Sequence, residues 1–379
     1  MKRTLLDGNG AAAWAVRLCD VDVVPNFPIT PQTEIIETLA KWKADGEWDG
    51  EFLEMEGEHS VMSAAIGSEA AGVRTFTASS SQGTLYMHEM MYIAAGMRLP
   101  IVMVNAARGL SAPITLWPDQ NDILAMRDTG WLIFFCQNNQ EVLDSIIQAY
   151  RICEDRDVLL PALINMEGFI HSYTREPVEI PDKGKVKRFL PRYKPKVFLD
   201  PKKPMCLGAA VMDEYTAFKS QVHRAQMNAK KLVEDVGKKF GKNFGRRYGL
   251  LEEYKLDDAD TVFISTGSLS TTVKQTIDEL RKEGKKPGLL RIRTFRPFPE
   301  KEIRTALADK DKIGVLDNDV APGFGGIIYS EVRSALYGTD KRISNYILSL
   351  GGRHVGVKDF KAIHKKIEKG SEKRYWLGL

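Results

Sequence analysis

The sequence predicts an α/β protein, with an open, doubly wound parallel-sheet domain followed by a smaller α/β domain. Short β-rich runs alternate with longer helical segments from residue 11 to about 170, as in parallel α/β sheets. The alternation resumes at Asp260, after a basic stretch. A chain of 379 residues with 43% hydrophobic residues is also long enough for two cores. We therefore expect two domains, at residues 1–250 and 256–379.

The first domain is expected to alternate strands with helices. Its strands are short runs rich in β-branched and aromatic residues, and its helices are longer periodic segments. The expected strands are 21–25, 51–55, 74–78, 100–106, 131–136 and 161–166, and the expected helices are 31–43, 58–72, 83–96 and 139–154. Thr30 and Pro31 are expected to open the first of these helices, as N-cap and first-turn proline.

Residues 181–250 are predicted to be a basic excursion from the first domain. Nine Lys and Arg residues lie between Lys183 and Lys203, among several prolines, which is typical of an extended surface segment. Apolar residues then recur at near-helical spacing from Phe218 to Phe240. We expect a solvated helix that leads into a linker; a docking arm for an acidic partner subunit is the alternative, ahead of nucleic-acid binding.

The second domain is expected to have a sheet of four or five strands. Its predicted elements are strands at 261–266, 288–294 and 312–317, a helix at 269–283, and a glycine loop at 321–326 followed by another helix.

Composition excludes several classes of protein. The net charge of +4 is mild for this length, so no nucleic-acid partner is indicated. The four cysteines lie far apart without a CxxC pair, which argues against a zinc or iron–sulfur site on this chain; they are Cys19, Cys136, Cys153 and Cys206. We expect buried free thiols, no membrane span and a cytoplasmic location.

One glycine motif near the N-terminus resembles a dinucleotide-binding fingerprint. Gly8, Gly10 and Ala13 fit GxGxxG/A, but only a short run precedes them and the acids at Asp20 and Asp22 come too early. We interpret residues 8–10 as a turn that leads into an N-terminal helix.

Four unusual segments each follow directly on a predicted strand. They are 26–30 with Thr30, 56–59 with Glu58, 79–83 with three serines and Gln82, and 107–110 with Arg108. Because the carboxyl ends of parallel strands line one edge of a sheet, these segments are expected to converge. A hydroxyl, a carboxylate, exposed backbone N–H groups at 79–83 and one guanidinium suit a small carboxylate or oxoacid. Taken singly, each residue is more often a helix cap or a surface ion pair.

Several catalytic motifs are missing from the sequence. It has no Walker loop, HExxH, GxSxG, or GDG followed by Asn, the usual metal–diphosphate element of thiamine enzymes. The six histidines show no metal-ligand spacing, and we expect structural or solvated roles for them. His59, beside Glu58, is the possible exception.

Three segments resemble the α subunit of 2-oxoacid:ferredoxin oxidoreductases, most closely the pyruvate:ferredoxin branch. They are FPITPQTEIIE at 27–37, EGEHSVMSAAIGSEAAGVRTFTASSSQG at 56–83, and ARGLSAPITLWPDQNDILAMRDTGW at 107–131. RTFRPFP at 293–299 and VLDNDVAPGFGG at 315–326 resemble the transketolase-C-terminal-like domain of the same family. The resemblance implies that the first domain is of the pyrimidine type found in thiamine enzymes.

The resemblance also implies a site shared between subunits. Glu58 matches the glutamate that hydrogen-bonds the aminopyrimidine of thiamine diphosphate, and Thr30 and Arg108 match residues that hold the substrate. Pro28, Ile29, Ser81 and Gln82 are the further expected cofactor contacts. A β subunit would bind the Mg²⁺–diphosphate group and carry a [4Fe–4S] cluster. The other clusters would lie on γ and δ subunits or on ferredoxin-like subunits. The expected assembly is a dimer of heteromers, with coenzyme A as cosubstrate and ferredoxin as electron acceptor.

The substrate and the reaction type leave alternatives open. The loop from Arg108 to Asp122 is expected to line the substrate pocket. Thr30 in place of a second arginine favours a monocarboxylate such as pyruvate over a dianion such as oxalate, and 2-oxoglutarate and oxalate are kept as alternative substrates. Phe27 and Trp117 leave a branched or aryl 2-oxoacid such as phenylglyoxylate open. A transketolase-like or carboligase half and a non-catalytic scaffold subunit are the competing hypotheses.

Overall fold

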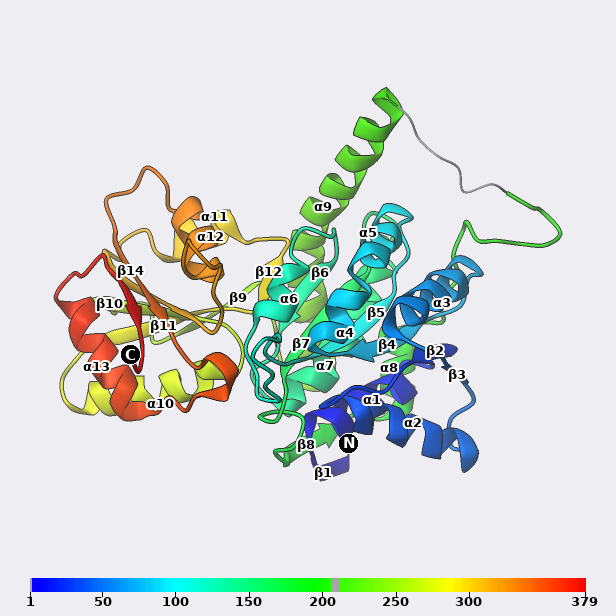
Figure 1. Ribbon diagram of the computed structural model, residues 1–379, viewed down its shortest axis with the longest axis horizontal. Coiled ribbons are helices and arrows are strands. Elements are labelled where there is room, and N and C mark those ends of the chain that lie inside the picture. Colours follow the sequence, from blue (N-terminus) through cyan, green and yellow to red (C-terminus); the bar gives the residue numbers. More distant parts are fainter. Residues whose placement is uncertain (1, 206–211) are drawn as a thin grey trace.

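A computed structural model describes residues 2–205 and 212–379, so Cys206 lies outside the described residues. It has two α/β units that lie side by side (Figure 1). The sheet of the first unit has the order β12-β6-β7-β5-β4, and the β2-β3 pair adjoins β4 through a bridge between Val23 and Thr75. The strands are β2 (Val23–Asn26), β3 (Glu51–Glu54), β4 (Phe76–Ser79), β5 (Val102–Ala107), β6 (Leu132–Phe135), β7 (Ala162–Glu167) and β12 (Thr294–Arg296). All are parallel except β12, which is antiparallel to β6.

The sheet is doubly wound, as predicted, because helices cover both of its faces. Along β5, Val102 and Val104 face one apolar cluster, whereas Met103 faces the other. The first cluster includes residues of α1 (Gly8–Leu18), α7 (Asn139–Cys153) and α9 (Asp213–Phe244). The second includes residues of α3 (Glu58–Ala70) and α5 (His88–Gly96). All six predicted strands of this unit are present.

Local departures from the predicted helices occur near the N-terminus. Residues 8–10 do not form a separate turn before the helix. They are already helical, at the start of α1, because the Asp7 side chain accepts from the Gly10 amide and caps the helix. The strand before it, β1 (Lys2–Leu6), pairs only with β8 (Glu176–Ile180) in a small antiparallel sheet. Since β1 is largely exposed, the buried strand that a dinucleotide fingerprint requires is missing there.

Two other helix predictions also need correction. Thr30 and Pro31 do not open α2 (Thr33–Ala44), whose N-cap is Gln32. The predicted helix at 83–96 is divided at Met87 into α4 (Ser81–Tyr86) and α5.

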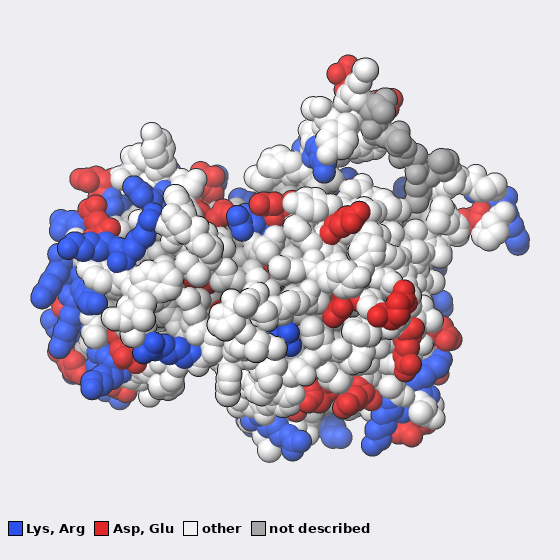
Figure 2. Space-filling view, viewed as in Figure 1, with Lys and Arg blue, Asp and Glu red and all other residues white. Residues whose placement is uncertain are grey.

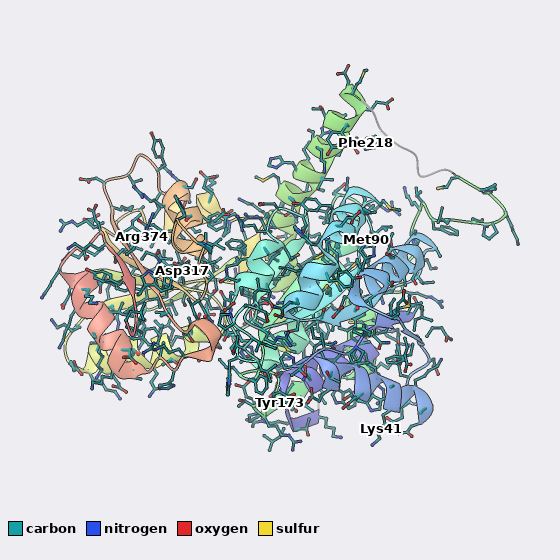
Figure 3. All side chains as sticks on the ribbon, viewed as in Figure 1. Lys41, Met90, Tyr173, Phe218, Asp317 and Arg374 are labelled. Atoms are coloured by element: carbon teal, nitrogen blue, oxygen red, sulfur yellow. The ribbon has the colours of Figure 1, made fainter. Side chains whose placement is uncertain are left out.

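The basic excursion is more ordered than predicted. It includes α8 (Lys183–Phe189), which buries Val186 and Phe189, before the exposed part of the segment begins. The C-terminal half of α9 is core rather than a solvated helix, since Ala225, Ala229, Val233, Val236, Phe240 and Phe244 are buried. The helix runs through Gly237, where any Cβ would overlap the Tyr248 carbonyl oxygen, so this glycine permits the chain to return closely. Only the N-terminal part of α9 projects beyond the body, with Phe218 on it (Figures 1 and 3).

The second unit has six strands, more than the predicted four or five. Their order is β15-β14-β13-β10-β11-β9, parallel except for β9. The strands are β9 (Leu251–Tyr254), β10 (Thr261–Ser265), β11 (Pro287–Ile292), β13 (Lys312–Asp317), β14 (Arg342–Ile347) and β15 (Arg374–Trp376). The helices are α10 (Leu269–Lys282), α11 (Glu300–Ala306), α12 (Ile327–Ala335) and α13 (Val357–Glu368).

The predicted strand at 288–294 ends early, at Ile292, and its continuation β12 crosses to the first unit's sheet. A buried ion cluster accompanies the crossing: Arg291 pairs with Glu141 of α7 through two bonds of 3.0 Å, and Arg293 bonds the same carboxylate at 2.8 Å. The second apolar cluster also continues from α3 and α5 into β10 and β11. The two units are therefore joined by a shared strand, shared charges and shared core.

Among the described residues, no helix combines the length and apolar character that a membrane crossing requires. Cys19, Cys136 and Cys153 are free and buried, as predicted.

Candidate functional site

Glu58 lies at the first turn of α3, at the carboxyl edge of the first sheet. The residue is 8% exposed, and its side chain lies against Gly83 of α4. A Cβ at Gly83 would overlap the Glu58 carboxylate and would lie 2.6 Å from the Ser79 hydroxyl oxygen. The absence of a side chain at residue 83 therefore lets the Glu58 carboxylate and the Ser79 hydroxyl lie over the same part of α4.

The turn from β4 into α4 holds Ser81 in a conformation that few residues adopt. Its φ is +48°, and its amide donates to the Asp122 carboxylate at 3.0 Å. The Ser81 hydroxyl bonds the Gln82 side chain at 2.5 Å and the Gly109 carbonyl at 3.0 Å. The prediction that the backbone N–H groups at 79–83 are exposed is thus wrong for Ser81, because its amide already donates to a buried aspartate.

Arg108 follows β5 and links two of the predicted segments. Its Nη1 donates to the Thr30 carbonyl at 2.7 Å and its Nη2 to Gln82 Oε1 at 3.0 Å. Burial lowers the pKa of Arg108, against the opposing effect of the Asp122 and Glu58 carboxylates. The structure thereby brings Thr30, Gln82 and Arg108 together, with Glu58 near enough to act on the guanidinium charge.

The segment at 26–30 contributes mainly backbone. The Thr30 carbonyl, rather than its hydroxyl, contacts Arg108. Pro28 is exposed and Ile29 is half-buried on the connection between β2 and α2. His59 is half-exposed, and its Nε2 lies 3.9 Å from Glu89 Oε2 on α5.

Four polar atoms of this edge are buried without a hydrogen-bond partner. They are Gln32 Oε1, Ser79 Oγ, Gln82 Nε2 and Arg108 Nε. Buried polar atoms are almost always paired in proteins, so such a cluster indicates a place where a polar ligand or water binds. Together with the Glu58 carboxylate, these donors and acceptors suit a nitrogen heterocycle and a small carboxylate.

Sequence reasoning placed the loop from Arg108 to Asp122 along the substrate pocket but gave Asp122 itself no role. Its carboxylate accepts from the amides of Ser81, Arg108 and Ile123 at 3.0, 3.0 and 2.6 Å. Burial raises the pKa of this carboxyl to about 6, although the backbone amides counter part of the rise. Asp122 therefore fixes the backbones that carry Ser81 and Arg108, a role for which the sequence gives no signal.

The raised pKa of Asp122 predicts a pH-dependent contribution to stability. Because the folded state holds the proton more tightly than the unfolded state, Asp122 stabilises the fold below pH 4, and this contribution is lost as pH rises to about 6. We expect wild type to gain about 2 kcal/mol over Asp122→Asn between pH 6 and 4, because one pKa unit is worth about 1.4 kcal/mol and the folded carboxyl is already half protonated at pH 6. Denaturant unfolding at several pH values measures this difference, and identical pH profiles for the two proteins would contradict it.

A wide cleft lies elsewhere in the molecule. It has a volume of about 1170 Å³ and lies between the C-terminal end of α9, β9 and α11. None of the predicted site residues lines it, and its buried guanidiniums, Arg291 and Arg293, are already paired with Glu141. The carboxyl edge of the first sheet therefore remains the candidate site.

Comparisons with known proteins find relatives that cover both units of the chain. Residues 14–238 match the family model described as pyruvate flavodoxin/ferredoxin oxidoreductase, thiamine diphosphate-binding, and residues 259–360 match pyruvate:ferredoxin oxidoreductase core domain II. Pyruvate synthase subunit PorA of Methanocaldococcus jannaschii is 49% identical over 99% of this chain and 97% of its own length. Ketoisovalerate oxidoreductase subunit VorA of Pyrococcus horikoshii is 44% identical over 97% of this chain and 94% of its own.

A solved structure extends the likeness to the fold. The 2-oxoglutarate:ferredoxin oxidoreductase from Magnetococcus marinus superposes with a TM-score of 0.72 at 17% identity, over 96% of this chain and 65% of that chain. The fold and the family match together define a subunit of a 2-oxoacid:ferredoxin oxidoreductase with a thiamine diphosphate-binding domain. The chain belongs to the pyruvate flavodoxin/ferredoxin oxidoreductase family.

Proposed function

We propose that this chain is the α subunit of a complex that oxidises pyruvate with coenzyme A to acetyl-CoA, CO₂ and reduced ferredoxin, or runs the reverse synthesis. The observation that carries the proposal is Arg108, a buried guanidinium beside Glu58 with an unpartnered Nε. A single cation of this kind suits one carboxylate. Residues 1–250 and 256–379 are the proposed domains, with the site in the first.

Glu58 is the proposed catalytic residue. The unpartnered Ser79 Oγ and Gln82 Nε2 near it offer a donor set that fits an aminopyrimidine, and Ser81, Pro28 and Ile29 complete the proposed cofactor contacts. When bound, thiamine diphosphate supplies the carbon nucleophile and electron sink for 2-oxoacid decarboxylation. Glu58 would hydrogen-bond a ring nitrogen of the pyrimidine. Its carboxyl would hold the proton that is exchanged with this nitrogen during the reaction.

Arg108 and Thr30 are the proposed substrate residues. The guanidinium is oriented by the Thr30 carbonyl and by Gln82, which leaves Nε for a 2-oxoacid oxygen. Since decarboxylation must release the bound carboxylate, one charge-assisted contact is better suited than a tighter clamp. Relatives named for pyruvate and for ketoisovalerate are both close to this chain, so a branched 2-oxoacid is the second candidate substrate.

A partner subunit is proposed to cover the Glu58 edge. Exposed apolar side chains lie along β3, α4 and α5 beside Glu58: Leu53, Leu85, Tyr86, Tyr92 and Ile93. The face over α4, α5 and α6 (Asn121–Ala125) is largely uncharged (Figure 2), as expected of a surface that another chain covers. We assign Mg²⁺–diphosphate binding and the proximal [4Fe–4S] cluster to a β subunit, with further clusters on γ and δ or ferredoxin-like subunits.

The complete assembly is proposed to be a dimer of heteromers. Its location is proposed to be the cytoplasm, because three buried free thiols suit a reducing compartment.

Anaerobic purification of the tagged chain from its host tests this function. Stoichiometric thiamine diphosphate, several irons per chain and coenzyme A-dependent ferredoxin reduction are expected with pyruvate, tested beside ketoisovalerate, phenylglyoxylate, 2-oxoglutarate and oxalate. A higher kcat/KM with another 2-oxoacid would reassign the substrate. The lack of both thiamine diphosphate and iron would contradict the proposal and favour a scaffold role.

Gly83 provides a test of the cofactor position. A Cβ there would overlap the Glu58 carboxylate, so Gly83→Ala is expected to weaken thiamine diphosphate binding by about 1–2 kcal/mol. Gly67→Ala is the matched control, because no atom lies within 4 Å of its added Cβ and alanine favours the α3 helix. Calorimetric titration of the apo complex measures both, and equal affinities for the two variants would refute this cofactor position.

A further inference from the structure

The carboxyl edge of the second sheet binds a loop of the first unit. In open α/β sheets this edge is the usual ligand site. Here three turns occupy it, at residues 266–268 after β10, 318–320 after β13 and 349–352 after β14. Asp317 marks the end of β13 (Figure 3). All three turns contact the segment at 117–121, which follows Arg108 in the chain.

Four hydrogen bonds from this edge hold that segment. The Gln120 amide donates to the Asn318 carbonyl at 2.7 Å, and the Thr266 hydroxyl donates to the Gln120 side-chain oxygen at 2.8 Å. The Asn121 side chain and the Val320 backbone bond each other twice, at 2.7 and 3.0 Å. Because Gln120 is fully buried, this contact is part of the packed interior.

The turn after β14 adds the closest approach. The Gly352 amide donates to the Pro118 carbonyl at 2.9 Å. Gly352 has a φ of +76°, and a Cβ on it would overlap the Trp117 Cβ and lie 2.9 Å from Trp117 Cγ. Only glycine both adopts this backbone and leaves space for Trp117.

The residue that Gly352 contacts, Trp117, is linked to Arg108 by the loop at 109–117, whose two ends are hydrogen-bonded to each other. The Gly109 amide donates to the Trp117 carbonyl at 3.0 Å, so the residue after Arg108 is bonded to the residue that Gly352 contacts. Trp117 also packs on Phe169, with the ring centres 5.0 Å apart. A displacement of Trp117 therefore shifts Gly109 and the backbone of Arg108.

We propose that Gly352, in the second unit, is a positioning residue for 2-oxoacid binding, because its turn sets the Trp117–Gly109 contact that orients Arg108. The inference rests on the proposed role of Arg108. The second unit would thus help to orient the substrate-binding residue, although it contributes no side chain to the Glu58 edge.

The test compares Gly352→Ala with Gly284→Ala in the purified complex. Gly284 has nearly the same backbone strain, with a φ of +81°, but no atom within 4 Å of an added Cβ. Gly352→Ala is expected to raise KM for pyruvate roughly tenfold, with kcat and thiamine diphosphate affinity within about twofold. Hydrogen exchange of the peptide at 109–119 should also become faster in Gly352→Ala alone.

Each outcome separates the proposal from its premise. Equal exchange and equal KM in the two glycine variants would overturn the positioning role. Faster exchange in a complex that does not turn over pyruvate would reject the proposed substrate and keep the contact. If Gly352→Ala does not fold, Asn121→Ala, which removes the bonds to Val320 without a clash, is expected to speed the same exchange and raise KM; wild-type values would overturn the proposal.

Discussion

Replacement of Glu58 by glutamine is expected to lower the rate of 2-oxoacid oxidation by about 10²–10⁴-fold, the range in which a lost proton-transfer group usually falls. The substitution keeps the size and hydrogen-bonding capacity of the side chain but removes the carboxylate that accepts a proton. Glu58 lies against Gly83 and only 8% of the residue is exposed, so its carboxylate is held in a packed position. Steady-state ferredoxin reduction by the purified complex measures the effect.

Glu69→Gln is the matched control for Glu58→Gln. Glu69 is a buried glutamate on the same helix, α3, and accepts from the Thr75 amide at 3.0 Å. Burial raises the pKa of Glu69 well above its usual value, which favours the neutral form that glutamine resembles. We expect near wild-type turnover in this variant. A wild-type rate for Glu58→Gln itself would reject the assigned mechanism and support a scaffold role.

Replacement of Arg108 by alanine is expected to act mainly on substrate binding. Truncation of one partner of a buried charge pair costs roughly 2–5 kcal/mol, which is at least about thirtyfold in KM for the 2-oxoacid. Arg108→Lys retains the charge but loses the forked contacts to Thr30 and Gln82, so we expect an intermediate KM. Initial rates over a range of pyruvate concentrations separate KM from kcat.

Arg98→Ala controls for the loss of a half-buried arginine. Arg98, like Arg108, makes two hydrogen bonds, here to the backbone carbonyls of Val158 and Leu159, but it precedes β5 and lies at the opposite edge of the sheet. Burial lowers its pKa as it lowers that of Arg108. An unchanged KM in Arg98→Ala is expected, and a similar rise in both variants would show that the effect of Arg108→Ala is not local.

The order of elements could be predicted from the sequence, because hydrophobic periodicity and turn residues are local properties. The six predicted strands of the first unit and helices α3 and α7 lie close to their predicted ranges. Position after a strand also predicted correctly that Thr30, Gln82 and Arg108 would meet, since parallel strands end at one edge. The roles of Glu58 and its neighbours remain predictions.

Long-range packing decided the remaining features. The basic, glycine-containing segment at 213–244 appears solvated by composition, but packing against α7 buries its second half. The single predicted strand at 288–294 divides between two sheets, and at the crossing Arg291 and Arg293 both bond Glu141, a residue about 150 positions earlier in the chain. No local pattern specifies which distant partner a strand or charge will find.

The sequence by itself determined the fold class, the family and the types of side chain at the carboxyl edge of the first sheet. Only the tertiary structure decided how those side chains are held. Asp122 binds the Ser81 and Arg108 amides, and Gly352 contacts Trp117 from the other unit. The physical reason is that hydrogen bonds and close contacts depend on distances in space, which residues far apart in the chain acquire only when both cores are packed.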